Sequence, residues 1–244
     1  NPHSGPDRIK LDAAEERNSY NQAHRRHHSF YRRFLRQRGF YDVYFFSKRG
    51  DLVYSTRKQD DYATDFVNGQ YAETPLGKAV QRMMDAEDEN AQTFTGFHRY
   101  APSGDRPAGF VAQPVFDGGQ KMGVLALEVP VDRLNAVMQR QAGTGKTGDT
   151  FVVGPDGTFR SRPRTVTGTT LLKTAFDSPA VERAINGEIG LFEGAGLGGD
   201  AALAAFAPID VMGTRWAILA QKDLSEIDAP VGDLIRTLVI ASLV

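Results

Sequence analysis

Two stretches, FFSKRGDLVYS at residues 45–55 and VVGPDGTFRSR at residues 152–162, align with each other without gaps. Each has an apolar run, a polar turn that contains glycine and a second short run, which is the pattern of a β-hairpin. A later pair, residues 113–134 and 207–224, aligns with small gaps and shares a proline, a turn, an apolar strand and an aspartate. A repeat of about 100 residues is a duplicated domain, because solenoid repeats span only about 20–50 residues.

The first copy predicts an antiparallel sheet with one helix inserted between its strands. Strands are expected at 41–47, 52–56, 93–100, 109–116 and 121–129. Thr74 and Pro75 are typical of an N-cap and a first helical position, so a helix is expected from there to residue 87. A further helix over 132–141 is expected to use Asp132 as its N-cap.

The second copy predicts the same order of elements. Its strands are expected at 151–153, 158–161, 191–194, 201–208 and 214–221, with a helix over 178–186 that Ser178 caps. The run AALAA at 201–205 favours a helix by propensity, but the repeat and Pro208 favour a strand. Antiparallel strands joined by short turns, with a helical insert, define an α+β fold for both copies.

The two ends of the chain have a different character. Residues 7–38 lack Pro and Gly and predict one long helix, which is polar nearly all round and which Gly39 ends. Such a helix needs outside support, so a parallel homodimer along residues 10–38 is expected. Residues 237–244, TLVIASLV, carry no charge and are interpreted as the start of a truncated membrane span. The alternative is a short core helix or a tail.

Composition excludes several classes of protein. The chain has 244 residues and 41% hydrophobic side chains, which is enough to bury a core. A net charge of −1 argues against general nucleic-acid binding, so no nucleic-acid partner is expected. The absence of cysteine excludes disulfides, thiolate metal sites and cysteine nucleophiles.

The residues resemble a known family. YDVYFFSKRGDLVYSTRKQDDYATDF (41–66), GTGKTGDTFVVGPDGTFRSRPR (143–164) and APIDVMGTRWAILAQKDLSEI (207–227) are similar to the double Cache sensor regions of bacterial receptors. The resemblance implies a long N-terminal helix (1–38), a membrane-distal PAS-like domain (39–130), a linking helix (131–143), a membrane-proximal PAS-like domain (144–222) and an exit helix (223–244). The aromatic-Arg-Tyr-Asp pattern of the amino-acid-binding subgroup is not present in recognisable form.

This resemblance implies a sensor and not an enzyme. A chemotaxis transducer anchored in the inner membrane, with this region in the periplasm, is the first expectation. The alternatives are an adenylate cyclase or histidine kinase sensor, and a docking module for a periplasmic binding protein. The small-molecule ligand stays open among amino acids, organic acids and amines, and no cofactor is expected.

In a PAS-like half, the sheet face and the loops over it form the pocket. Aromatic rings supply an apolar body, while hydroxyl, guanidinium and carboxylate groups supply polar contacts. About half of the candidates are expected to be core or surface residues, since aromatic residues dominate cores as well as sites. The candidate ligand-binding residues are Tyr44, Tyr54, Asp61, Tyr62, Tyr71, His98, Arg99, Tyr100 and Phe110.

Three other patterns resemble functional motifs but favour a structural role. Residues 143–148 and 194–199 both match GxGxxG, but neither follows a strand and opens a helix, so both are interpreted as turns. His24, His27 and His28 share one helix face, but the arginines around them would repel a metal ion. A solvated or dimer-facing stripe is expected there. Nucleotide hydrolysis or phosphate transfer through the glycine-rich turns is the enzymatic alternative.

Overall fold

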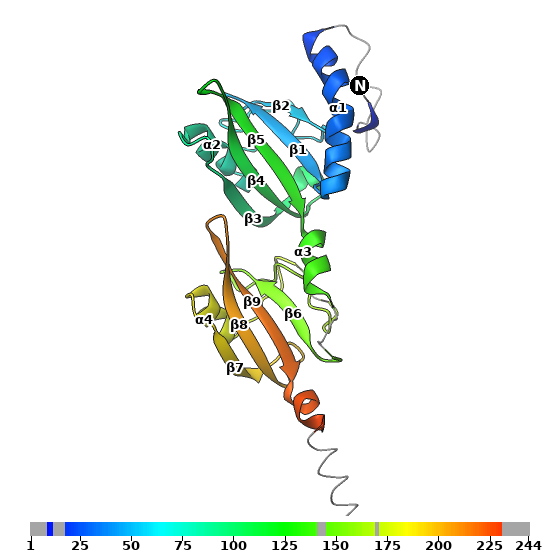
Figure 1. Ribbon diagram of the computed structural model, residues 1–244, viewed down its shortest axis with the longest axis vertical. Coiled ribbons are helices and arrows are strands. Elements are labelled where there is room, and N and C mark those ends of the chain that lie inside the picture. Colours follow the sequence, from blue (N-terminus) through cyan, green and yellow to red (C-terminus); the bar gives the residue numbers. More distant parts are fainter. Residues whose placement is uncertain (1–8, 12–17, 141–144, 169–170, 231–244) are drawn as a thin grey trace, which may run out of the picture. The chain divides into compact units, whose positions relative to one another are not determined.

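A computed structural model of the chain describes residues 9–11, 18–140, 145–168 and 171–230 (Figure 1). The chain divides between Arg133 and Leu134 into two compact units. Each unit contains one antiparallel sheet and a helix inserted between its strands, which confirms the predicted α+β class.

The first unit has a five-stranded sheet with the order β2-β1-β5-β4-β3. Its helix α2 (Pro75–Asp85) begins where the sequence predicts, because the Thr74 hydroxyl accepts the Gly77 N–H at 3.0 Å. The strands are β1 (Asp42–Ser47), β2 (Leu52–Ser55), β3 (Thr93–Tyr100), β4 (Arg106–Asp117) and β5 (Gln120–Pro130).

The two faces of this sheet pack against different elements. One face forms the main core with α2 and includes Tyr44, Phe66 and Phe110. The other face packs Val43 and Tyr54 against Leu35 of helix α1 (Ser19–Arg38). Figure 1 shows α1 and α2 on opposite sides of the sheet.

Helix α1 is shorter than predicted. Asn18 has an extended backbone and its side chain accepts the Asn21 N–H at 2.8 Å, so the helix begins at Ser19. The carbonyl of Ile9 accepts a hydrogen bond of 2.8 Å from His28. A continuous helix would separate these two residues by about 28 Å, so Ile9 lies beside α1 and not in line with it. Gly39 ends α1 in the left-handed conformation, as predicted.

The second unit has a four-stranded sheet with the order β6-β9-β8-β7. Ser178 caps its helix α4 (Pro179–Ile185), as predicted. The residues 201–205 lie in a strand, in agreement with the repeat and against their helical propensity. The strands are β6 (Asp149–Val153), β7 (Gly190–Ala195), β8 (Ala201–Val211) and β9 (Thr214–Asp223).

Two further sequence predictions are wrong. Residues 158–161 form only isolated bridges, because the Ser161 hydroxyl accepts the Val152 N–H at 2.9 Å, where a strand would supply a carbonyl. Asp132 lies inside helix α3 (Val131–Met138), which begins directly after β5. Its carboxylate therefore sits in the first turn, near the positive end of the helix dipole, and does not cap the helix.

The exit helix is described only in part. Residues 224–230 are helical, whereas the apolar segment 237–244 lies outside the described residues. So do residues 7–8 and 12–17 of the predicted long helix. Within the described ranges, no helix is both long enough and apolar enough to cross a membrane.

Candidate functional site

Three carboxylates are buried in the first unit. Asp42 accepts the backbone N–H groups of Val43, Thr56 and Arg57. The other two lie where the sheet meets α2 and the loop that follows β2. Glu128 projects from β5 and is 2% exposed, and Asp61 belongs to the loop and is 0% exposed. Charged side chains are almost never buried unless they are paired. The contacts of these two groups therefore decide what this part of the unit can do.

Hydroxyl groups hold Glu128. Tyr44 donates a hydrogen bond of 2.6 Å to its Oε2 atom, and Ser103 donates one of 3.0 Å to the same atom. Ser103 comes from the short 3-10 turn η2 (Ala101–Ser103). Burial raises the pKa of Glu128 to about 7, against the opposing effect of these two donors.

Only one of the two carboxylate oxygens of Asp61 accepts a hydrogen bond from another described residue. Tyr100 donates a hydrogen bond of 2.6 Å to its Oδ2 atom. In the described part of the chain, its buried Oδ1 atom has no hydrogen-bond partner. Burial raises the pKa of Asp61 to about 6. An unsatisfied buried acceptor costs about 1–3 kcal/mol, so a donor that reached Oδ1 would be bound favourably.

Aromatic rings surround these carboxylates. The Phe110 ring lies 5.9 Å from the Tyr44 ring and 4.9 Å from the Tyr100 ring, with both pairs edge to face. Tyr71 stacks on Phe66 at 5.5 Å and is partly buried. The result is an apolar wall that carries tyrosine hydroxyls close to two acids, which we name the acidic-aromatic cluster: Tyr44, Asp61, Tyr62, Tyr71, Ser103, Tyr100, Phe110 and Glu128.

The structure brings six of the nine candidate residues into this cluster and places three elsewhere. Tyr54 lies on the opposite sheet face, where its hydroxyl is 2.8 Å from Nδ1 of His28. Arg99 is at the surface and pairs with Asp105 at 2.7 Å. His98 is also exposed, and its Nε2 atom lies 2.7 Å from the carbonyl oxygen of Thr95.

Sequence reasoning missed Glu128 and Ser103. A signal for Glu128 existed, because it is the lone acid in the apolar run LALEVPV and alternation places it on the face of Val124 and Ala126. Ser103 offered no comparable signal. It reaches Glu128 only because η2 folds back over the sheet.

The loop that carries Asp61 also contacts helix α1. The hydroxyl of Tyr62 lies 2.7 Å from the hydroxyl of Tyr20, and Nζ of Lys58 lies 2.6 Å from Nε2 of His24. Residues on either side of Asp61 in the sequence are therefore bonded to α1. Hydrogen bonds therefore connect the loop that carries Asp61 to this helix.

The histidine face of α1 is not solvated, which corrects the expectation for His24 and His28. Both are buried, and their rings stack at 4.3 Å. Burial lowers the pKa of His28 to about 4. His27 is exposed. In the described residues, no three His, Cys, Asp or Glu side chains are placed to hold a metal ion.

The first glycine-rich turn binds a carboxylate of this chain. The backbone N–H groups of Lys146 and Thr147 donate to Glu226 at 3.0 and 2.7 Å, and the Thr147 hydroxyl donates at 2.6 Å. These bonds lower the pKa of Glu226 to about 2. Among the described residues of this turn, the backbone N–H groups of Lys146 and Thr147 are therefore already occupied by Glu226. The second glycine-rich segment joins β7 to β8 as a hairpin, as interpreted from the sequence.

Two α+β units in tandem, each an antiparallel sheet with an inserted helix, have a tandem PAS-like fold. The sequence profile of the Cache domain family matches residues 8–231, and the chain belongs to this family. No curated protein sequence matches the chain. Cache sensor domains are ligand-binding, non-catalytic modules, and those of chemoreceptors and histidine kinases are extracellular.

Solved structures share the fold at low identity. The extracellular domain of a putative histidine kinase has a TM-score of 0.60 at 16% identity, over 89% of this chain and 85% of that one. The Pseudomonas aeruginosa PAO1 amino acid chemoreceptor PctC, in complex with GABA, has a TM-score of 0.55 at 18% identity, over 88% and 85%. PctB of the same organism, in complex with L-Arg, has a TM-score of 0.53 at 20% identity, over 79% and 75%.

Proposed function

We propose that the chain is the extracytoplasmic sensor region of a bacterial transmembrane receptor, and that its first unit binds a small molecule bearing a protonated amine. The observation that carries this proposal is the buried pair of Glu128 and Asp61, whose Oδ1 atom lacks a partner among the described residues. An ammonium group has three hydrogen-bond donors and a positive charge. It would donate a hydrogen bond to Oδ1 of Asp61 and also balance the charge of the buried carboxylates.

The surroundings support a small amphipathic ligand. The rings of Tyr44, Tyr100 and Phe110 offer apolar contact, and Tyr62 and Tyr71 lie at the edge of the same core. An aromatic face also attracts a cation. The ligands bound by PctC and PctB, GABA and L-Arg, both carry an amine, which agrees with this chemistry.

Signal transmission is proposed to run through helix α1. Ligand contact at Asp61 would shift the loop whose Lys58 and Tyr62 side chains contact α1, and so alter the balance between two states of the receptor. The first unit would be membrane-distal, and α1 would pair with its copy in a parallel homodimer. The output module is proposed to be a chemotaxis transducer in the inner membrane, with a cyclase or histidine kinase as the alternative.

The direct test is a screen of the whole chain by thermal shift and calorimetry against amino acids, amines, purines and organic acids. At least one amine or amino acid is expected to raise the melting temperature, because a ligand that binds only the folded state stabilises it. Stabilisation by organic acids alone would contradict the amine site. If no small molecule binds, the docking module for a periplasmic binding protein becomes the better reading.

The affinity for the amine is expected to fall as the pH decreases from 8 to 6. The pKa of Glu128 is about 7 and that of Asp61 about 6, so acidification protonates the two groups that must be ionised to pair with an ammonium. Below its pKa, each carboxyl loses about tenfold in ionised fraction per pH unit. Calorimetric Kd values across this range measure the effect.

A matched control separates this effect from histidine titration. His98→Gln removes an exposed histidine near the cluster in sequence and is expected to keep the same pH dependence. A Kd that stays constant from pH 8 to 6, or that improves on acidification, would rule out ionised carboxylates as the amine partner.

A further inference from the structure

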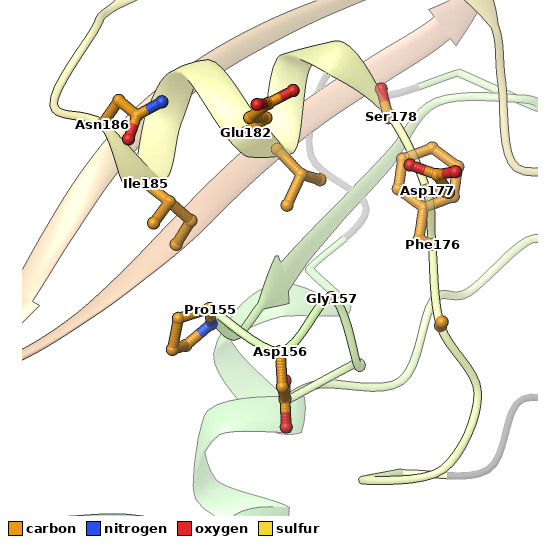
Figure 2. Close-up of a pocket in the computed structure, with 11 residues that line it drawn as sticks. Pro155, Asp156, Gly157, Phe176, Asp177, Ser178, Glu182, Ile185 and Asn186 are labelled. Carbon is orange, nitrogen blue, oxygen red and sulfur yellow. The ribbon is translucent and has the colours of Figure 1, made fainter.

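The second unit has a cavity of about 450 Å³ between the turn after β6 and helix α4. Figure 2 shows Ile185 projecting from α4 towards Pro155 of the turn, with Phe176 and Asp177 at the side of the opening. This volume falls within the range of small-molecule sites, which is about 300–1,000 Å³. The residues that matter for its chemistry are Pro155, Asp156, Phe176, Asp177, Glu182 and Ile185.

The two copies of the repeat align at the hairpin turn and differ in the connection that follows it, which is where the cavity lies. The Phe66 N–H donates to the Gly50 carbonyl at 3.0 Å in the first unit, and the Phe176 N–H donates to the Gly157 carbonyl at 2.9 Å in the second. These bonds align the two hairpin turns and the two phenylalanines. From there the units differ, since residues 67–73 separate Phe66 from the helix cap Thr74, whereas Asp177 alone separates Phe176 from Ser178.

The longer connection fills the equivalent space in the first unit. Side-chain atoms of Val67 and Met84 lie against the position that a Cβ would take on Gly50. At Gly157, no atom lies within 4 Å of the corresponding position. Helix α4 also ends at Ile185, earlier than its counterpart α2. The second unit therefore lacks the longer segment that fills this space in the first unit.

The lining combines apolar surface with negative charge. Phe176, Ile185 and Pro155 provide apolar contact, while Asp156, Asp177 and Glu182 provide carboxylates. Asp156 is paired with Arg160 at 2.9 Å. In the ranges that the structure describes, neither Asp177 nor Glu182 has a side-chain hydrogen bond or ion pair. Two negative charges thus remain available to a ligand at the opening.

We propose that this cavity is a second small-molecule site, which takes an organic cation whose ammonium group pairs with Asp177 and Glu182 and whose apolar body packs on Phe176 and Ile185. It is lined entirely by the second unit and does not depend on the site proposed in the first. The region would then report two ligand concentrations, one for each unit.

The test uses the whole chain, labelled with ¹⁵N, and compares phenethylammonium with its neutral analogue 2-phenylethanol. The cation is expected to shift the backbone amide signals of Gly157, Phe176 and Asn186, and the alcohol to shift them at least about threefold less at equal concentration. An exposed ion pair contributes about 0.2–1 kcal/mol, so the double variant Asp177→Asn, Glu182→Gln is expected to weaken the Kd about two- to tenfold.

Two controls make the outcome decisive. Glu193→Gln removes an exposed carboxylate that does not line the cavity and is expected to leave the Kd unchanged. Glu128→Gln alters the first unit and is also expected to leave these amide shifts intact. The inference fails if the three amides do not shift, if the alcohol shifts them as strongly, or if the double variant binds like the parent chain. Loss of the shifts in Glu128→Gln would assign them to the first unit instead.

Discussion

Glu128→Gln is expected to abolish amine binding in the first unit and, above pH 7, to stabilise the ligand-free protein. Burial raises the pKa of Glu128 from 4.5 to about 7, so its ionised form is disfavoured in the folded state. A group with a raised pKa contributes stability at low pH and loses it as the pH rises through the folded value. Glutamine never ionises, so the variant avoids that loss.

The expected gain is about 1–2 kcal/mol at pH 8 and close to zero at pH 5. The glutamine carbonyl can still accept the hydrogen bonds from Tyr44 and Ser103, but its NH₂ group adds a buried donor, which lowers the gain. Thermal unfolding at both pH values and calorimetry with the amine from the screen measure the two effects. Destabilisation of the variant at pH 8 together with unchanged amine binding would contradict the role of Glu128 in the site. Arg99→Ala, at an exposed ion pair, is the control and should change neither the stability nor the amine affinity.

Phe66→Ala is expected to destabilise the first unit by about 3–5 kcal/mol, the usual cost of emptying a buried phenylalanine site. Phe66 is 0% exposed and its ring lies 4.9 Å from that of Phe46. The matched change Phe176→Ala in the second unit should cost only about 1–2 kcal/mol, because Phe176 is half-buried beside the cavity and leaves less of a void.

A natural probe separates the two units. Trp216 is the only tryptophan and lies in β9 of the second unit, so its fluorescence follows that unit alone, while circular dichroism follows both. In urea, Phe66→Ala should move the circular dichroism transition and leave the fluorescence transition in place. An equal shift in both signals would mean that the chain unfolds as one cooperative block.

Most of the fold was predictable because its signals are local. The caps at Thr74 and Ser178, the turn glycines and the strand alternation act within a few residues, and the repeat resolved the ambiguous run at 201–205. The wrong predictions concern places where contacts between residues far apart in the sequence determine the structure. Asn18 caps α1 eleven residues after the predicted start, and Ile9 contacts His28, which no pattern inside a polar helix indicates.

In the acidic-aromatic cluster, too, local patterns predicted some residues and long-range contacts determined the others. Aromatic alternation was sufficient to select Tyr44, Tyr100 and Phe110, but aromatic content could not separate them from Tyr54, which faces α1. Glu128 acquires its partners through contacts with Tyr44, across neighbouring strands, and with Ser103, from a turn. Alternation along β5 indicates the face of Glu128, but only the folded sheet and η2 bring Tyr44 and Ser103 to it, so these partners could not be predicted from spacing.

The bonds between the glycine-rich turn and Glu226 have a mechanical consequence. Three hydrogen bonds from Lys146 and Thr147 join Glu226, in the first helical turn after β9, to the segment that precedes β6. An ion pair of 3.3 Å with Lys222 joins the same carboxylate to the end of β9. Glu226 keeps its charge at any physiological pH, since its pKa is about 2. The carboxylate therefore ties the first turn of residues 224–230 to the segment that precedes β6. We expect a shift of the edge strand β6 to move this helical turn with it, because the same carboxylate joins the turn to the segment that leads into the strand.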